Sequence, residues 1–149
     1  MTFSSAATIR SSAAAFRRAL EMIPRKDRGV SLAEFPHGSC SDAADLLGTY
    51  LSERRLSEFV YVSGERQYPG DPTRRSSHAW LEQSGLIIDI TAVQFEKVDD
   101  PLLVTRDSAW HCSWTLTHRR VADFRGAGSC AGGTLARVYK AAAIRADAG

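Results

Sequence analysis

The chain has 149 residues, of which 44% are hydrophobic and 24% are charged, the balance typical of one globular domain. Its 19 basic and 17 acidic residues leave a formal charge of only +2, which argues against a general polyanion-binding protein. No window approaches the roughly 18 apolar residues of a membrane-spanning helix, and the three cysteines lack CxxC spacing. We expect one domain over residues 1–149 in the reducing cytoplasm, with neither membrane nor nucleic acid as a partner.

The first 23 residues predict a helix from about Ser4 to Met22 that stops before Pro24. Its apolar residues recur at steps of three and four and therefore share one face. These residues are Ile9, Ala13, Phe16, Leu20 and Ile23. We expect this helix to pack on the domain. The absence of acidic residues before Glu21 leaves a mitochondrial-type targeting segment open as an alternative.

A polar connection over residues 24–36 leads to a turn of small and capping residues at 38–42. The spaced apolar residues that follow predict a second helix, with Cys40 at its start and Glu53 near its end.

The middle of the chain predicts strands. Residues 59–62 are β-branched or aromatic, and residues 76–82 and 86–90 form two further strands joined by a turn. Between them, residues 65–77 are rich in proline, glycine and charge, which predicts a surface loop that could act as a lid.

Weaker strands are predicted after this hairpin, followed by a glycine-rich turn and a closing helix. In order, these segments are 102–105, 115–117, 120–124, 126–133 and 134–146. Strands that do not alternate with crossover helices predict an α+β fold.

Cys40 is a candidate nucleophile, because unpaired N–H groups and the helix dipole stabilise a thiolate at a helix start. The same N–H groups could stabilise an oxyanion on an attacked carbonyl. A buried, unreactive cysteine is the alternative, but the polar neighbours Ser39, Ser41 and Asp42 argue against it.

His78 and Asp89 are the candidate base and orienting acid, because each lies on one strand of the predicted hairpin. A turn centred on Gln83 and Ser84 would place residue 78 directly opposite residue 89. Asp89 interrupts an apolar strand, where an ionised carboxylate needs a partner. Simple pairing of the two side chains at a solvent-facing sheet surface is the alternative.

Three stretches resemble the Cys–His–Asp core of the transglutaminase-like branch of the papain-like superfamily. They are Gly38-Ser39-Cys40, Ser77-His78-Ala79-Trp80-Leu81-Glu82, and Gly85-Leu86-Ile87-Ile88-Asp89-Ile90-Thr91. The resemblance covers about residues 30–95. Within this branch the chain is most similar to the cysteine proteases that cleave leader peptides in lasso peptide biosynthesis, and to small bacterial transglutaminase-like proteins.

The resemblance implies a papain-like α+β fold with a catalytic core at 38–95, in which the nucleophile helix packs on an antiparallel sheet. It implies Cys40 as nucleophile, His78 as base and Asp89 as orienting acid. The reaction would be acyl transfer from an amide through a thioester: peptide hydrolysis first, or glutamine deamidation or transamidation, or transfer to a small amine. The resemblance implies no metal or organic cofactor, and a peptide or protein substrate with or without a partner protein that recognises it.

One departure from the papain pattern concerns the oxyanion hole. Papain-type enzymes carry a glutamine upstream of the cysteine, whereas this chain has Glu34, so the second oxyanion donor is unassigned. Gln94, Trp110 and His111 follow Asp89, and any of them could line the site. The candidate substrate-binding residues are Trp80, Gln94, Arg74, Arg75 and Trp110. Trp80 shares a sheet face with His78 and is expected mainly to pack in the core.

Other functions stay open. Zinc could be bound by a set drawn from His37, Cys40, His111, Cys112, His118 and Cys130. The alternative for His111 and His118 is that they are ordinary surface histidines.

The arginine pairs are spread along the chain and interspersed with acids, which argues against nucleic-acid binding. Arg74 and Arg75, near His78, are kept as residues that could select an acidic or phosphate-bearing substrate. A catalytically inactive binding module has the same sequence features, and Glu82 with Asp89 is too little to indicate a glycosidase.

Overall fold

The computed structural model describes residues 4–68, 70–95, 97–127 and 132–149, and it confirms the α+β class. The helices are α1 (Ala6–Met22), α2 (Cys40–Glu53), α3 (Ala109–Cys112) and α4 (Gly132–Ala148). The strands are β1 (Val60–Tyr68), β2 (Asp71–Gln83), β3 (Leu86–Asp89), β4 (Leu103–Thr105) and β5 (Thr115–Val121). They form one antiparallel sheet in the order β4-β3-β2-β1-β5.

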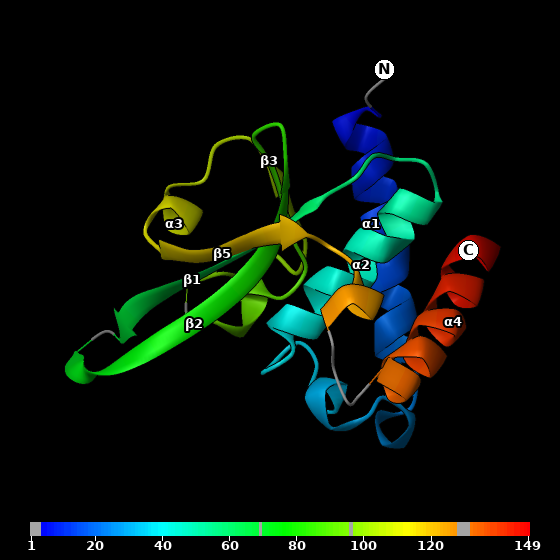
Figure 1. The fold of residues 1–149 in the computed structure, drawn as a ribbon, viewed down its shortest axis with the longest axis horizontal. Helices are drawn as coiled ribbons and strands as arrows, with labels where there is room; N and C mark the ends of the chain where they lie inside the picture. The colour runs from blue at the N-terminus through cyan, green and yellow to red at the C-terminus, as the bar shows by residue number, and fades with distance from the viewer. Residues whose placement is uncertain (1–3, 69, 96, 128–131) are drawn as a thin grey trace.

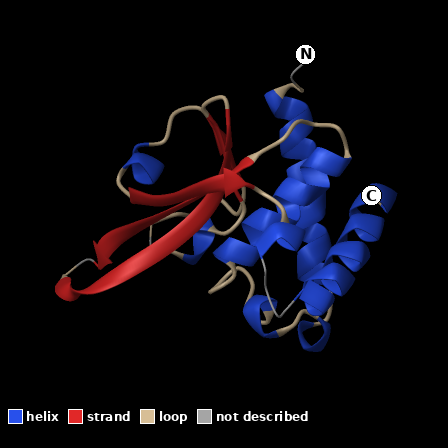
Figure 2. Cartoon of the chain, in the orientation of Figure 1, coloured by secondary structure: helices blue, strands red, loops and turns tan. Residues whose placement is uncertain are grey.

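The three long helices gather on one side of the molecule and the sheet lies on the other (Figure 1). α2 packs against β1 and β2, while α1 and α4 pack against each other and both contact α2. The far end of the β1–β2 hairpin projects away from the helices (Figure 2). None of the helices in the described part of the chain has the length and apolar character needed to cross a bilayer.

The helix predicted near the N-terminus is confirmed. Its first turn is capped by the side chain of Ser5, which accepts a hydrogen bond from the N–H of Thr8 at 3.2 Å. All five residues of the predicted apolar face are buried, and α1 therefore packs on the core as expected. The closing helix is also present and is slightly longer than predicted.

The predicted loop at 65–77 is wrong. β1 continues to Tyr68 and β2 begins at Asp71, so most of this segment forms a long hairpin rather than a lid. Pro72 is accommodated because the register of the two strands shifts between Gln67 and Tyr68, where regular pairing is interrupted.

The predicted centre of the β2–β3 turn is also wrong. The turn residues are Ser84 and Gly85, both with positive φ (48° and 82°), which is the backbone that a two-residue hairpin turn needs. The strands pair Leu81 with Ile88 and Gln83 with Leu86, so His78 does not lie directly opposite Asp89. The two residues lie diagonally across the strands.

The C-terminal half differs in detail from the prediction. Instead of two strands at 115–117 and 120–124, a single strand, β5, runs from Thr115 to Val121, and Phe124 already belongs to the 3₁₀ turn Phe124–Ala127. The short helix α3 was not predicted. Residues 128–131, within the predicted glycine-rich turn, lie outside the described residues, and so does Cys130.

Two apolar clusters cover the two faces of the sheet. The larger joins the helices to alternate residues of β2, including Ala79 and Leu81. The smaller consists of Val62, Trp80, Ile87 and Trp114, with Val60, Phe95 and Trp110 packed against it. Alternation along β2 therefore sends Trp80 to the second cluster, the face on which the ring of His78 also lies.

Candidate active site

Cys40 is the first residue of α2, as predicted, and its side chain is half-buried against the larger apolar cluster. The residue before it, Ser39, is buried and its hydroxyl donates to the carbonyls of Ser31 and His37, which fixes the chain entering the helix. Ser41 shares a 2.6 Å hydrogen bond with the hydroxyl of Tyr61 on β1. The thiol therefore lies at a helix start anchored on both sides, where the first N–H groups have no acceptor within the helix.

His78 and Asp89, the other two predicted residues, are brought together. Nε2 of His78 lies 2.7 Å from Oδ2 of Asp89, and both side chains are almost completely buried. A carboxylate can only accept, so the imidazole carries a hydrogen on Nε2. The two residues do not face solvent, and the alternative of simple surface pairing is therefore wrong.

The carboxylate of Asp89 is fully hydrogen-bonded. Its Oδ1 accepts from the N–H groups of Thr91 and Ala92, each at 2.9 Å. Its Oδ2 accepts from His78 and, at 2.8 Å, from Nε2 of His111. Burial alone would raise the pKa of Asp89, but attraction to His78 and the hydrogen bonds from both imidazoles hold that pKa well below its usual range.

His78 has one nitrogen in use and one free. Its Nδ1 is buried and has no hydrogen-bond partner among the described residues. Burial disfavours the charged ring, but Asp89 and Cys40 outweigh that effect and raise the pKa of His78 to about 9. Since Asp89 binds at Nε2, the free Nδ1 is the nitrogen through which His78 can act on another group.

Of the two interpretations of His111, the surface histidine is wrong: His111 is buried and bonded to Asp89, in keeping with the alternative that it lines the site. It lies on α3, which begins at Ser108. The hydroxyl of Ser108 lies 2.6 Å from Nδ1 of His111 and also accepts the N–H of the same residue. Both ring nitrogens of His111 are therefore occupied, and among these two histidines only His78 has a nitrogen free for proton transfer.

The N-terminal helix also contributes to the position of Asp89. The side chain of Arg17 is largely buried, and its Nε donates to the carbonyl of Ile90 at 2.9 Å. Its guanidinium lies 5.1 Å from the centre of the Phe35 ring, in the segment that leads to Cys40. α1 thus holds the end of β3 next to the loop before the candidate nucleophile.

The predicted zinc ligands do not come together in the described part of the chain. His37, Cys112 and His118 are exposed, and Cys130 lies outside the described residues. A different group, His78, Asp89 and His111, has ligand atoms within 4.8 Å of one another. Two imidazoles and a carboxylate can hold a transition metal, but here both Nε2 atoms donate hydrogen to one carboxylate oxygen, and a cation would have to displace both protons.

Of the candidate substrate-binding residues, Gln94 and Trp110 line a cavity of about 520 Å³, together with Phe95 and Arg66. The rings of Phe95 and Trp110 also contact the ring of His78, at 5.0 and 5.5 Å between centres. This cavity therefore lies beside the candidate base. Trp80 does not line it, because Trp80 is buried in the smaller apolar cluster.

Arg74 and Arg75 lie on the projecting part of the β1–β2 hairpin. The guanidinium of Arg74 covers the ring of Tyr68 at 4.5 Å, and Arg75 pairs with Glu65 at 3.4 Å. Tyr68 also lines the cavity beside His78, so Arg74 contacts a residue of the cavity wall. Neither arginine is among the residues that line this cavity.

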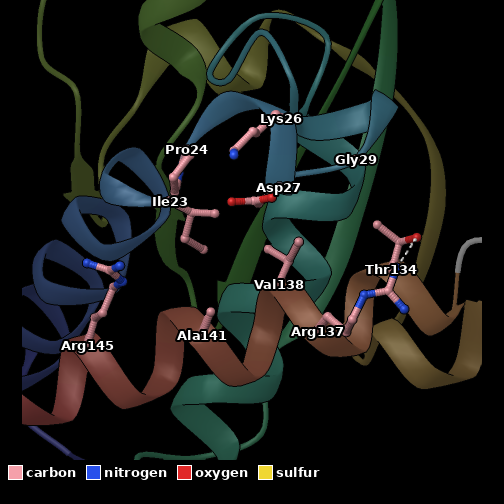
Figure 3. Close-up of a pocket in the computed structure, with 10 residues that line it drawn as sticks. All are labelled: Ile23, Pro24, Lys26, Asp27, Gly29, Thr134, Arg137, Val138, Ala141 and Arg145. Carbon is pink, nitrogen blue, oxygen red and sulfur yellow. Dashed lines mark hydrogen bonds between the residues drawn. The ribbon is translucent and has the colours of Figure 1, made fainter.

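A second cavity, of about 560 Å³, lies between the end of α1 and α4. Figure 3 shows Val138 and Ala141 of α4 on one side, and Ile23 with the charged Lys26 and Asp27 on the other. Neither Cys40 nor any member of the Asp89 group lines it.

Comparison of the chain with protein-family models, with curated proteins and with solved structures gives no match. The functional argument therefore depends on the geometry of the site and on the chemistry of its residues.

Proposed function

We propose that this protein is a cysteine-dependent acyl-transfer enzyme of papain-like, transglutaminase-like type, which cleaves an amide through a thioester on Cys40. The observation that carries the proposal is the state of His78. Asp89 holds the ring by Nε2, while Nδ1 is left buried and free, and Cys40 lines the same small pocket as Asp89. A base oriented by a carboxylate next to a thiol is the arrangement that nucleophilic cysteine catalysis requires.

The first half of the reaction follows from these positions. Starting from the neutral form of His78, Nδ1 takes the thiol proton, and the sulfur of Cys40 forms a bond to the carbonyl carbon while the carbonyl electron pair moves onto oxygen. When that pair returns, the carbon–nitrogen bond breaks and the amine leaves with the proton from His78. Asp89 keeps the ring in one orientation and stabilises its positive charge.

Water completes the reaction. His78 takes a proton from water as the hydroxyl attacks the thioester, and Cys40 leaves as the thiolate, which releases a carboxylic acid. Transfer to an amine follows the same steps with nitrogen in place of water. We place hydrolysis first, for a peptide or protein amide.

Thiol alkylation tests the proposal, because Cys112 is exposed and provides an internal reference in the same molecule. At pH 6 ordinary thiols are almost entirely protonated and are alkylated slowly, whereas a positively charged imidazole beside a sulfur speeds its alkylation. We expect iodoacetamide to alkylate Cys40 at least about tenfold faster than Cys112, although Cys40 is less exposed. The modified peptides are quantified by mass spectrometry.

The matched variant is His78→Gln, which fills much of the same space but cannot take a proton. It should remove the excess reactivity of Cys40 and leave Cys112 unchanged. Slow alkylation of Cys40 that does not depend on His78 would contradict the proposal. Stoichiometric metal in the purified protein, together with a change in Cys40 alkylation on adding a chelator, would favour a metal site at His78, Asp89 and His111 instead.

A further inference from the structure

Unpartnered polar atoms are concentrated around the candidate active site. Within the described residues, four buried side-chain atoms lack a hydrogen-bond partner: Arg66 Nε, His78 Nδ1, Gln94 Nε2 and Trp114 Nε1. The ring of Trp114 lies 5.6 Å from that of His78, and the guanidinium of Arg66 lies 4.4 Å above Trp114. Proteins leave few buried donors unpaired, and such atoms are expected where a ligand supplies the missing bonds.

The orientation of the Gln94 amide follows from its one hydrogen bond. The N–H of Gly38 donates to Oε1 of Gln94 at 3.2 Å. A backbone N–H needs an acceptor and an amide nitrogen cannot accept, so the oxygen faces Gly38 and the NH₂ group points elsewhere. That NH₂ group is the buried, unpartnered donor.

Gln94 connects the two halves of the candidate site. Gly38 belongs to the loop immediately before Cys40. Gln94 itself ends the 3₁₀ turn Ala92–Gln94, whose first N–H donates to the carboxylate of Asp89. Gln94 also lines the cavity of about 520 Å³ beside His78. Its free donor is therefore fixed between the nucleophile loop, the orienting acid and a space that can receive a substrate.

Acyl transfer at Cys40 needs such a donor. Negative charge develops on the carbonyl oxygen when sulfur attacks, and two hydrogen-bond donors usually stabilise it. The backbone N–H at the start of α2 supplies one. We propose that Nε2 of Gln94 supplies the other, so that Gln94 is a catalytic residue that touches the reacting oxygen. This inference rests on the proposed function.

Two reagents separate this role from a structural one. p-Nitrophenyl acetate acylates the thiol through a tetrahedral oxyanion and releases p-nitrophenolate, whereas iodoacetamide is attacked at a saturated carbon and forms no oxyanion. We expect Gln94→Ala to slow acetylation of Cys40 by about 10²-fold, the usual cost of losing one oxyanion donor. Alkylation of Cys40 should change by no more than about twofold, because it depends on the thiolate alone.

Gln94→Glu is the sharper variant, since its carboxylate still accepts from Gly38 but has no N–H to donate. The alkylation rate of Cys40 is compared at the pH above which it no longer increases in each protein. A difference in the ionisation of the thiol then does not affect the comparison. The matched control is Gln83→Ala, at the end of β2 next to the β2–β3 turn, where the glutamine amide donates to the hydroxyl of Ser57 at 2.6 Å. It should leave both rates unchanged.

Each outcome gives a decision. Slow acetylation with normal alkylation in both Gln94 variants supports the inference. Unchanged acetylation, or equal loss of both rates, overturns it and leaves Gln94 a structural residue, even if Cys40 depends on His78. If Cys40 in the unmodified protein is acetylated no faster than Cys112 and its alkylation is independent of His78, the proposed function fails and the role of Gln94 fails with it.

Discussion

The carboxylate of Asp89 accepts four hydrogen bonds, two from backbone N–H groups and two from imidazoles. A buried carboxylate is costly unless it is paired and hydrogen-bonded, and this one has no unused oxygen. The two histidines that bind Asp89 differ in whether the second ring nitrogen has a hydrogen-bond partner. His78 presents a free nitrogen, while Ser108 occupies the second nitrogen of His111. His111 therefore acts by positioning Asp89.

Replacement of His111 should distinguish its positioning of Asp89 from the proposed catalytic role of His78. His111→Ala leaves Oδ2 of Asp89 with one donor fewer and opens space in the cluster, and we expect it to lower the free energy of unfolding by about 2–4 kcal/mol. The rate of Cys40 alkylation at pH 6 should fall by less than in His78→Gln. Urea denaturation measures the first effect, and the neighbouring exposed variant Cys112→Ser should show no loss. A His111→Ala protein as stable as the parent contradicts this role.

The sequence could identify Cys40, His78 and Asp89 because the helix start and the two strands leave a local pattern. His111 leaves none. It lies 22 residues after Asp89, beyond β4, on a four-residue helix that no periodicity predicts. Only the three-dimensional path of that connection brings it back to the carboxylate. Gln94 lay close enough to Asp89 in the sequence to be considered, but its free donor becomes evident only from the bond to Gly38.

The β2–β3 hairpin shows how a wrong register can leave a site intact. Moving the turn centre by one residue moves the cross-strand partner of His78 by two positions. Side chains alternate between faces with a period of two, so the partner stays on the same face. His78 and Asp89 therefore still meet, now diagonally, where long side chains remain within reach. The sequence predicted the shared face reliably, whereas the turn residues that set the register were ambiguous.

α2 is held close to the chain that follows β5, and Gly48 makes this approach possible. A Cβ at position 48 would lie 2.4 Å from Cβ of Ala122, whose own N–H is bonded to the carbonyl of Phe59 at 3.0 Å. The obstructing atom is thus next to an anchored backbone and cannot swing aside. The absence of a Cβ at Gly48 therefore allows the helix that carries Cys40 to lie this close to the segment after β5.

Gly48→Ala should therefore destabilise the protein, although alanine is the better helix former by about 1 kcal/mol. Overpacking costs about 1–3 kcal/mol, and we expect the loss to exceed the gain. Chemical denaturation of the variant measures the net change. Ser52→Ala, on the exposed side of the same helix, is the control for helix propensity and should be neutral or slightly stabilising. Gly48→Ala with a higher denaturation midpoint than the parent would show that α2 can shift freely.

Polar links tie α2 to both sides of the molecule. Asp45, buried in α2, accepts two hydrogen bonds of 2.8 Å from Arg120 on β5. At the other end of the helix, Arg54 pairs with Asp147 of α4, and Tyr50 donates to the same carboxylate at 2.9 Å. The helix that begins with Cys40 is thereby fixed to the sheet and to the outer helices, while Asp89 is fixed to α1 through Arg17 and Ile90. The relative positions of Cys40 and Asp89 therefore depend on the whole fold.

The raised pKa of His78 predicts how the free energy of unfolding varies with pH. The pKa of His78 is raised from 6.5 to about 9, so between these values the folded protein binds a proton that the unfolded chain does not. The stabilisation is fully present below pH 6.5 and is lost as the pH rises through about 9. Asp89, whose pKa is lowered, stays ionised throughout this window. We expect the free energy of unfolding to fall by up to about 3 kcal/mol from pH 6 to pH 9.5.

Urea denaturation at a series of pH values measures this change, and His78→Gln identifies its source. The variant should be less stable than the parent at pH 6, and its stability should vary much less between pH 6.5 and 9, because the group that binds the extra proton is gone. The midpoints of the two proteins should therefore converge as the pH rises. A parent protein whose stability is constant or increases over this range would mean that His78 is not protonated in the fold. The imidazolium beside Asp89 would then not exist in the resting state.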